Sequence, residues 1–470
     1  MLHLRASLVA VLLSTLTVSS SGRPSIVPAP PGSSSGQPEA GKAAGPDAPI
    51  KERVTKIDKA LDGEIPDLVA LYQHLHTNPE LSLFEVKTAA RLADEVRKLG
   101  FDVTEKVGGN GVVAVLKNGP GPVVLLRTDM DALPVTEQTG LAYASKVRMK
   151  DRLGVEVGVM HACGHDIHMA CWVGTARVLS GMKDQWSGTL VLIAQPAEEI
   201  VAGARMMLED GLYKRFPKPD FALALHSDSL QPVGVVSYTE GLAMANSDTV
   251  DILVKGKGGH GASPHTGVDP IVLSARIILD LQTIVSREVN PLDPCVVTVG
   301  SIHGGTKHNI IPNEVKLQLT VRTTRTEVRD HVLKAIDRIA KAAAAGARAP
   351  APEVRVNLDE YTPATFNEVA LVRKTVPLFK DLLGEKNVKT RAPVMGAEDF
   401  GRLSQGGVPI FMYFLGTVPQ EKYDAAQKPD APPLPGMHTD SYAPLPEPSI
   451  RTGVRTECLA IMNLMPGKKQ

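Results

Sequence analysis

Short apolar runs that alternate with amphipathic stretches of helical period are the feature that most constrains how this chain can fold. Apolar positions recur at helical spacing in residues 65–75 and 89–99. Strand-like runs cover residues 112–116, 123–126, 189–194, 221–225 and 410–415. Because helical stretches separate several of these runs, we predict an α/β fold with a mainly parallel sheet that helices cover on both faces.

Residues 246–352 have a different order of elements and are predicted to form an inserted domain. We expect a strand at 249–255, a helix at 270–287, strands at 296–302 and 314–323, and a helix at 327–345. This β-α-β-β-α order suits a small two-layer α+β domain. The main domain would then consist of two segments, residues 51–245 and 353–470, with the insert as a lid between them.

The N-terminus has the pattern of a secretory signal peptide. Arg5 precedes an apolar run at residues 8–13, and small residues follow at 19–22. The run is shorter than the roughly 20 apolar residues of a membrane-spanning helix. Residues 1–22 are therefore predicted to be a signal peptide and residues 23–50, rich in Pro, Ser, Gly and Ala, a flexible linker. We expect an exported protein, periplasmic or secreted, without a membrane span.

The charge balance argues against a nucleic-acid partner. Lys+Arg and Asp+Glu number 51 each, so no net field draws the chain to a polyanion. The spacing of the four cysteines, of which Cys163 is the most informative, does not resemble a disulfide framework.

Polar residues follow three of the predicted strands. Residues 127–131 (RTDMD) follow the first strand, residues 195–199 (QPAEE) the second, and His226 the third. Ligands in open α/β sheets bind beyond the carboxyl ends of the strands. If these strands are parallel neighbours, two carboxylate pairs and a histidine converge on one crevice.

The segment at residues 160–166 (MHACGHD) adds a thiol and an imidazole to this crevice. Cys163 and His165 flank a glycine, and a thiolate and an imidazole two residues apart on a turn can reach one metal ion. Alone, a cysteine or a histidine is more often a plain packing or surface residue. The combination with the carboxylate pairs is what favours a metal site.

With these segments identified, the chain resembles the aminoacylase-type di-metal metallopeptidases. The likeness is to the amidohydrolase branch, which holds hippurate hydrolases, auxin-amino acid conjugate hydrolases and N-acyl amino acid amidohydrolases, and it runs from about residue 60 to about residue 460. The motifs that carry it are DMDALP at 129–134, HACGHD at 161–166, QPAEE at 195–199, GGH at 258–260, HNIIPN at 308–313 and GAEDF at 396–400.

The resemblance implies two divalent metal ions per subunit. Cys163 would bridge them, with His165, Glu199, His226 and His438 as the other protein ligands. Each metal would then have about three protein ligands and room for a water, as catalytic sites need. Thiolate and imidazole favour Zn²⁺, while carboxylates in a mixed site also admit Mn²⁺, Co²⁺ or Ni²⁺.

The resemblance also implies roles for five residues near the metals. Glu198 would be the general base, and Asp131 would orient a residue of the metal site. In the insert, His260 would stabilise the oxyanion, and Asn309 and Arg322 would bind the substrate, Arg322 through its carboxylate.

Three departures from the family pattern concern the surroundings of the site. Asp129 stands where relatives outside this branch have a metal-binding histidine, and His165 is expected to replace that ligand. Residues 148–157 form a charged insertion, expected to loop, in front of the HACGHD motif. His438 follows a Pro-rich stretch at residues 429–435. We expect the last two to affect substrate preference rather than the metal chemistry.

The implied function is metal-dependent hydrolysis of the amide bond of N-acyl amino acids or similar amides that bear a carboxylate. Three alternatives remain: a dipeptidase or carboxypeptidase on the same scaffold, an inactive metal-binding or substrate-binding homologue, and a cysteine hydrolase with Cys163 as nucleophile. Retention of Glu198 argues against the inactive homologue, because a binding site needs no base. A homodimer is expected, with His260 reaching into the partner's active site.

Overall fold

The computed structural model describes residues 50–467. The predicted signal peptide lies outside the described residues, as does the predicted linker except for Ile50, where helix α1 (Ile50–Asp62) begins. Among the described residues, no helix combines the length and apolar character needed to cross a membrane.

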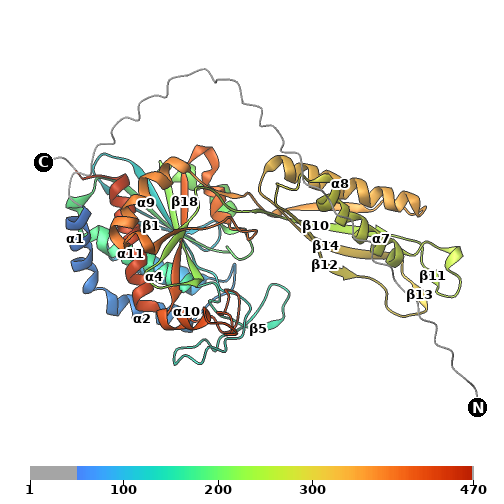
Figure 1. Cartoon of the computed structure of the whole chain (residues 1–470), viewed down its shortest axis with the longest axis horizontal. Helices are drawn as coiled ribbons and strands as arrows, with labels where there is room; N and C mark the ends of the chain where they lie inside the picture. Colours follow the sequence, from blue (N-terminus) through green and yellow to red (C-terminus); the bar gives the residue numbers. More distant parts are fainter. Residues whose placement is uncertain (1–49, 468–470) are drawn as a thin grey trace, which may run out of the picture. The chain divides into compact units, whose positions relative to one another are not determined.

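The main domain is built on an eight-stranded sheet with the order β1-β2-β6-β3-β7-β18-β8-β17 (Figure 1). The strands are β1 (Asp102–Val107), β2 (Gly111–Asn118), β3 (Val123–Asp129), β6 (Gly188–Gln195), β7 (Phe221–Pro232), β8 (Val236–Tyr238), β17 (Val388–Thr390) and β18 (Ile410–Val418). Strand β3 pairs in parallel with both β6 and β7, and β18 pairs in parallel with β7. Antiparallel pairs join β1 to β2 and β2 to β6. The predicted mainly parallel sheet is confirmed.

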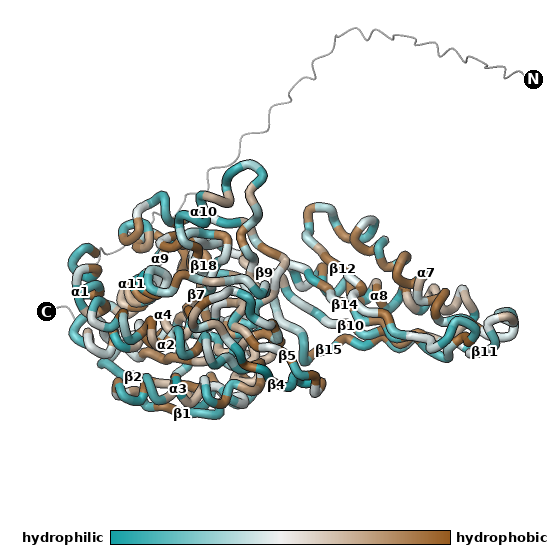
Figure 2. The backbone as a smooth tube through the Cα atoms, turned by 90° about the horizontal axis from the view of Figure 1, so that it is seen from below, coloured by the Kyte–Doolittle hydropathy of each residue, from teal (hydrophilic) through white to brown (hydrophobic). Residues whose placement is uncertain are grey.

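Helices cover both faces of this sheet because the strands are apolar on both faces. Val124 and Leu126 of β3 point into one core and Leu125 into the other, as the two-residue period of a strand requires. The first core is covered by α1, α2 (Ile65–Thr77), α3 (Val86–Arg97), α4 (His165–Gly181), α9 (Val369–Leu383) and α11 (Pro446–Leu464). The second is covered by α5 (Gly203–Glu209), α6 (Leu212–Arg215) and η5 (Asp399–Gly407). The central strands themselves consist largely of hydrophobic residues, whereas edge strand β1 is mostly hydrophilic (Figure 2).

The insert forms a second, fully antiparallel sheet with the order β12-β14-β10-β15. Its elements are β10 (Asn246–Lys255), α7 (Pro270–Thr283), β12 (Cys295–His303), β14 (Glu314–Thr323), α8 (Thr326–Gly346) and β15 (Glu353–Thr362). Helices α7 and α8 pack on one face of the sheet and share one apolar core with it (Figure 1). The inserted two-layer α+β domain is thus confirmed.

Two segments of the structure differ from expectation. Strand β15 belongs to the second sheet, although the expected boundary at residue 352 falls just before it. It is an edge strand in which every side chain except that of Thr362 is at least partly exposed, and the alternation of Val354, Val356 and Leu358 with polar residues was the available sign that the insert continues past residue 352. Residues 148–157, expected to loop, lie in the hairpin of β4 (Arg148–Lys150) and β5 (Glu156–Gly158). Its three-residue strands are too short and too charged to give a strand pattern.

The remaining elements are short. They are β9 (Gly241–Met244) paired with β16 (Thr365–Asn367), β11 (Gly259–His260) paired with β13 (Ile310–Ile311), helix α10 (Gln420–Ala426), the 3₁₀ turns η1 (Lys183–Gln185), η2 (Pro264–Thr266) and η4 (Glu385–Asn387), and the π-helical turn η3 (Ile284–Glu288).

Candidate metal centre

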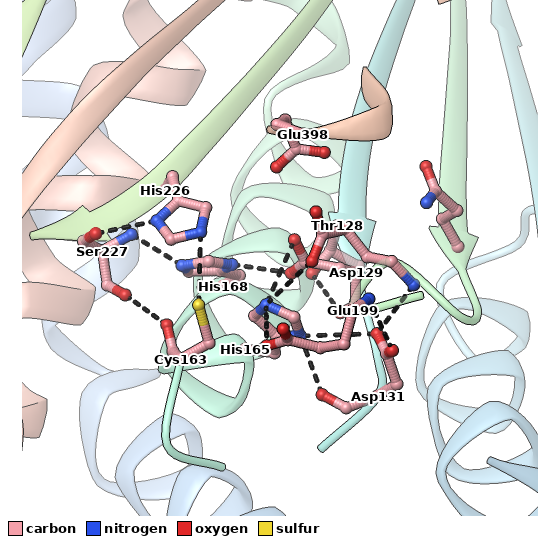
Figure 3. Close-up of polar contacts among 12 residues, drawn as sticks. Thr128, Asp129, Asp131, Cys163, His165, His168, Glu199, His226, Ser227 and Glu398 are labelled. Atoms are coloured by element: carbon pink, nitrogen blue, oxygen red, sulfur yellow. Dashed lines mark hydrogen bonds and ion pairs between the residues drawn. The ribbon is translucent and has the colours of Figure 1, made fainter. Parts of the chain in front are cut away.

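The polar residues of the central strands converge as the parallel pairing requires (Figure 3). Strand β3 ends at Asp129 and β6 ends at Gln195, directly opposite it. His226 lies inside β7 rather than after its end, because pairing with β18 continues the strand to Pro232. The polar side chains therefore do converge, and His226 joins them from within a strand.

Cys163 lies at the centre of the five predicted metal ligands. Its Sγ is 3.5 Å from Nε2 of His226 and 3.3 Å from Nε2 of His438. Glu199 is 3.5 Å from Nε2 of His438 through one oxygen and 3.7 Å from Nε2 of His165 through the other. The ligand atoms of Cys163, His165 and His226 lie within 4.8 Å of one another, and so do those of Cys163, Glu199 and His438. Cys163 is common to both groups, which suits a bridging ligand.

The donor atoms of this cluster fit a divalent metal. Within residues 50–467, His165 Nε2 and Glu199 Oε1 are buried without a hydrogen-bond partner, although they face each other. Buried polar atoms are normally paired, because leaving one unpaired costs free energy. A thiol, imidazoles and a carboxylate directed at one point are the donors that zinc and similar ions take.

The two buried histidines of the cluster are oriented by backbone carbonyls. Nδ1 of His165 donates to the carbonyl oxygen of Asp131 at 2.7 Å, and Nδ1 of His226 donates to that of Ser227 at 2.8 Å. Each contact places the proton on Nδ1 and therefore leaves a lone pair on Nε2, which faces Cys163 or Glu199. A neutral imidazole with a free Nε2 lone pair is the form that binds a metal.

The side chain of Asp131 holds the loop that contains both glutamates. It accepts hydrogen bonds from the backbone N–H groups of Glu198 and Glu199, at 3.1 and 2.9 Å, and from the hydroxyl of Ser82 at 2.6 Å. Ala197 and Val201, on either side of the glutamates, have positive φ values of 52° and 50°. Such strained backbone persists only where surrounding contacts impose it.

Glu198 lies next to the ligand cluster in a strongly acidic environment. One of its oxygens is 3.9 Å from Nε2 of His165, and its carboxylate is grouped with those of Glu398 and Asp399. Burial, and then the negative charge of Glu398, raise the pKa of Glu198 well above its usual range. Arg127, fully buried, balances part of this charge, with Nη2 2.7 Å from Glu398 and Nη1 2.6 Å from Asp129.

His168 is a member of the site that sequence reasoning missed. Its Nδ1 lies 2.6 Å from Asp129, and its Nε2 accepts the backbone N–H of Ser227 at 2.7 Å. Both ring nitrogens are therefore engaged, and the ring braces β3 against β7. Asp129 is in turn held by Arg127 and His168, and one of its oxygens lies 3.7 Å from Nε2 of His165, so its ligand atom also groups with those of His165 and His168. The available signal was the three-residue spacing from His165, which puts both histidines on one helix face.

The three predicted residues of the insert lie in two places, with Arg322 near one end of strand β10 and His260 and Asn309 beyond its other end. Arg322 pairs with Ser247 near the start of β10, and its Nε donates to Thr320 at 3.0 Å. Strand β10 continues from there for eight residues, or about 27 Å at the usual rise, before the chain reaches His260. Asn309 lies beside His260, because its carbonyl accepts the N–H of Gly261 at 2.8 Å.

Known proteins resemble this chain over most of its length. It is 38% identical over 364 residues to thermostable carboxypeptidase 2 of Saccharolobus solfataricus, covering 76% of this chain and 88% of that protein. It is 37% identical over 344 residues to the hippurate hydrolase of Campylobacter jejuni, covering 72% and 86%. The crystal structure of YXEP from Bacillus subtilis, a dinuclear metal binding peptidase, superposes with a TM-score of 0.68 at 28% identity, covering 86% and 99%.

The sequence profile of peptidase family M20/M25/M40 matches residues 125–431, which include the motifs around Asp129, Cys163 and Glu199. Together with the ligand cluster, this match confirms the predicted pair of divalent metal ions and the predicted metal-dependent hydrolysis. The chain belongs to the peptidase family M20/M25/M40 and is a metal-dependent amide or peptide hydrolase.

Proposed function

We propose that this enzyme hydrolyses the amide bond of N-acyl amino acids or similar amides that bear a free carboxylate. The hippurate hydrolase among its relatives supports this substrate class. The observation that carries the proposal is the separation of the two adjacent glutamates. Both glutamates share a group of ligand atoms with His165. Glu199 also belongs to a group that contains Cys163 and His438, whereas Glu198 is otherwise grouped with Glu398 and Asp399 and lies outside both groups that contain Cys163.

This separation gives each glutamate one task. Glu199 is the metal ligand, and Glu198 is the general base, which takes a proton from water and delivers it to the leaving amine. The two metal ions, when bound, polarise the substrate carbonyl and lower the pKa of the attacking water. Asp131 maintains the arrangement, because it holds the backbone of both glutamates.

A peptidase activity is the second candidate, favoured by the 38% identity to a carboxypeptidase. The two are distinguished by assaying purified enzyme with N-acyl amino acids and with unblocked dipeptides, with Zn²⁺, Mn²⁺, Co²⁺ and Ni²⁺ in turn. We expect turnover of the N-acyl amino acids. Turnover of the dipeptides alone would contradict the proposal and assign the enzyme to the peptidases.

We also propose that the enzyme is a homodimer formed through the insert. Strand β12 is an edge of its sheet, and unpaired strand edges favour association. Large apolar side chains are exposed nearby, among them Val272 and Leu279 of α7, the latter 70% exposed, and Ile302 of β12. The distance along β10 between Arg322 and His260 gives a reason for the dimer, because a partner's insert can supply His260 to this chain's metal centre.

A mixing experiment tests this arrangement. The Glu198→Gln and His260→Ala variants should each be nearly inactive alone. In a two-fold heterodimer, one site has both defects and the other has neither. Random exchange at equal amounts makes about half of the dimers mixed, so roughly a quarter of all sites should regain activity. Confirmed subunit exchange without recovery would show that His260 acts in its own chain or not at all.

We further propose that the protein is exported. The support is the basic residue, short apolar run and small residues at positions 1–22.

A further inference from the structure

A cavity of about 160 Å³ lies at the rim of the site and has an apolar wall. Leu81, Phe84, Pro134, Leu153 and Ile200 contribute this wall. Leu153 is 87% exposed and Phe84 39% exposed, so both keep apolar surface in contact with water. Neighbouring apolar side chains that remain exposed mark a binding surface more often than scattered ones do.

The cavity borders the loop that holds the two glutamates. Ile200 directly follows Glu199 in the chain, and Ser82, which also lines the cavity, donates its hydroxyl to Asp131. Glu85, one residue beyond Phe84, accepts the backbone N–H of Ala197 at 2.8 Å. The apolar wall is therefore attached to the loop that holds both glutamates, next to the metal ligand Glu199.

The β4–β5 hairpin supplies the outer part of the cavity. The carboxylate of Asp151 accepts the N–H groups of Leu153 and Val155 at 2.9 and 2.8 Å, and Gly154 takes the left-handed conformation, φ 80°, that closes the turn. At its base, Met149 and Val157 pack on a small apolar cluster that contains Leu81 of the cavity wall. The hairpin is thus attached to the wall, and its turn presents Leu153 in a defined position.

We propose that this cavity receives an apolar acyl group of the substrate and that Leu153 is a specificity-determining residue. The inference rests on the proposed hydrolysis of N-acyl amino acids. Binding of the acyl group would be driven by the removal from water of its own apolar surface and of the apolar surfaces of Leu153 and Phe84. Asp151, the acidic residue of the rim, is engaged by the hairpin backbone. Arg152 also lines the cavity and is the group that a carboxylate would select there instead.

The experiment compares kcat/KM for N-acetyl-, N-butanoyl- and N-hexanoyl-L-alanine in the parent and in Leu153→Ala. We expect the ratio of hexanoyl to acetyl activity to fall about tenfold, a typical effect of removing apolar contacts from a pocket. Leu153→Met should restore most of the ratio. Val155→Ala is the matched control, since Val155 is exposed on the same hairpin but does not line the cavity. Its ratio should equal that of the parent.

Three outcomes would overturn the inference. An unchanged ratio in Leu153→Ala, or an equal fall in Val155→Ala, would show that Leu153 does not select the acyl group. An Arg152→Ala variant with KM raised equally for all three substrates would assign the cavity to the carboxylate. If the parent enzyme hydrolyses none of the three substrates, the proposed function itself is refuted. If it hydrolyses them but the ratio does not depend on Leu153, only this inference is refuted.

Discussion

Replacing Glu198 by glutamine should abolish turnover and leave the metals in place. The substitution keeps the shape of a buried side chain and removes its ability to accept a proton. A general base contributes a factor of about 10² to 10⁴, or roughly 3 to 5 kcal/mol of barrier, and the loss should appear in kcat. Because Glu198 lies outside both groups of ligand atoms that contain Cys163, metal content should stay near that of the parent.

The assay pairs steady-state kinetics with metal analysis of the dialysed protein. Cys163→Ala is the contrasting variant, since its Sγ lies within 3.5 Å of both His226 and His438, and it should lose activity and metal together. The unfolding temperature of Glu198→Gln should be no lower than that of the parent, because glutamine cannot carry a negative charge beside Glu398 and Asp399. Loss of metal from Glu198→Gln would reverse the roles of the two glutamates. Activity within tenfold of the parent would show that Glu198 is not the base.

Three further predictions test other parts of the reasoning. Chelation should inactivate the enzyme and lower its unfolding temperature, since ligands at a hundredfold excess over Kd stabilise by about 2.7 kcal/mol; chelator-resistant activity that thiol alkylation destroys would instead favour Cys163 as a nucleophile. Burial disfavours the charged form of His76, yet its hydrogen bonds to Asp166 and Glu137 raise its pKa to about 9. This stabilisation, roughly 3 kcal/mol, should be complete below about pH 6.5 and be lost as pH rises through about 9; equal pH slopes of the unfolding free energy for parent and His76→Gln would contradict it. Mass spectrometry of exported protein should find an N-terminus trimmed near residues 19–22, and an intact Met1 in that fraction would refute the signal peptide.

The parts of the fold that sequence predicted correctly are those where burial dictates residue type. Strand β3 is apolar from Val123 to Leu126 and β6 from Leu190 to Ala194 because both faces of the sheet are covered, so these runs could be predicted, although β3 continues for three polar residues beyond the predicted run. Strand β15 and the β4–β5 hairpin lie at edges where most side chains are at least partly exposed. Exposed positions accept many residue types, so the three-residue strands of the hairpin carry little information about the backbone. Strand β15 does alternate between polar and apolar residues over 353–358, but that pattern does not say which of the two sheets the strand joins.

The residues of the site likewise divide into those that the sequence could identify and those that it could not. Glu199 lies after β6 on a loop held by Asp131, and the parallel pairing of β6 with β3 brings it to the end of β3. Cys163 and His165 lie at the start of α4 and were identified by the spacing of a thiol and an imidazole in one motif. His168 could not be identified as a brace, because its partners, Asp129 and the N–H of Ser227, become neighbours only after β3 and β7 pair.

The role proposed for His260, unlike that of the metal ligands, depends on how two subunits associate. The metal centre is set by contacts within one sheet, whereas His260 and Arg322 stand at opposite ends of the strands of the insert. A single insert cannot put both residues at one metal centre unless it bends sharply along its own antiparallel sheet, whose ladder of hydrogen bonds resists bending. The two-fold dimer proposed above needs no such distortion, because His260 would come from the insert of the partner. The proposed pairing of inserts therefore gives residues from both ends of one sheet a way to serve the same reaction, and the mixing experiment tests it.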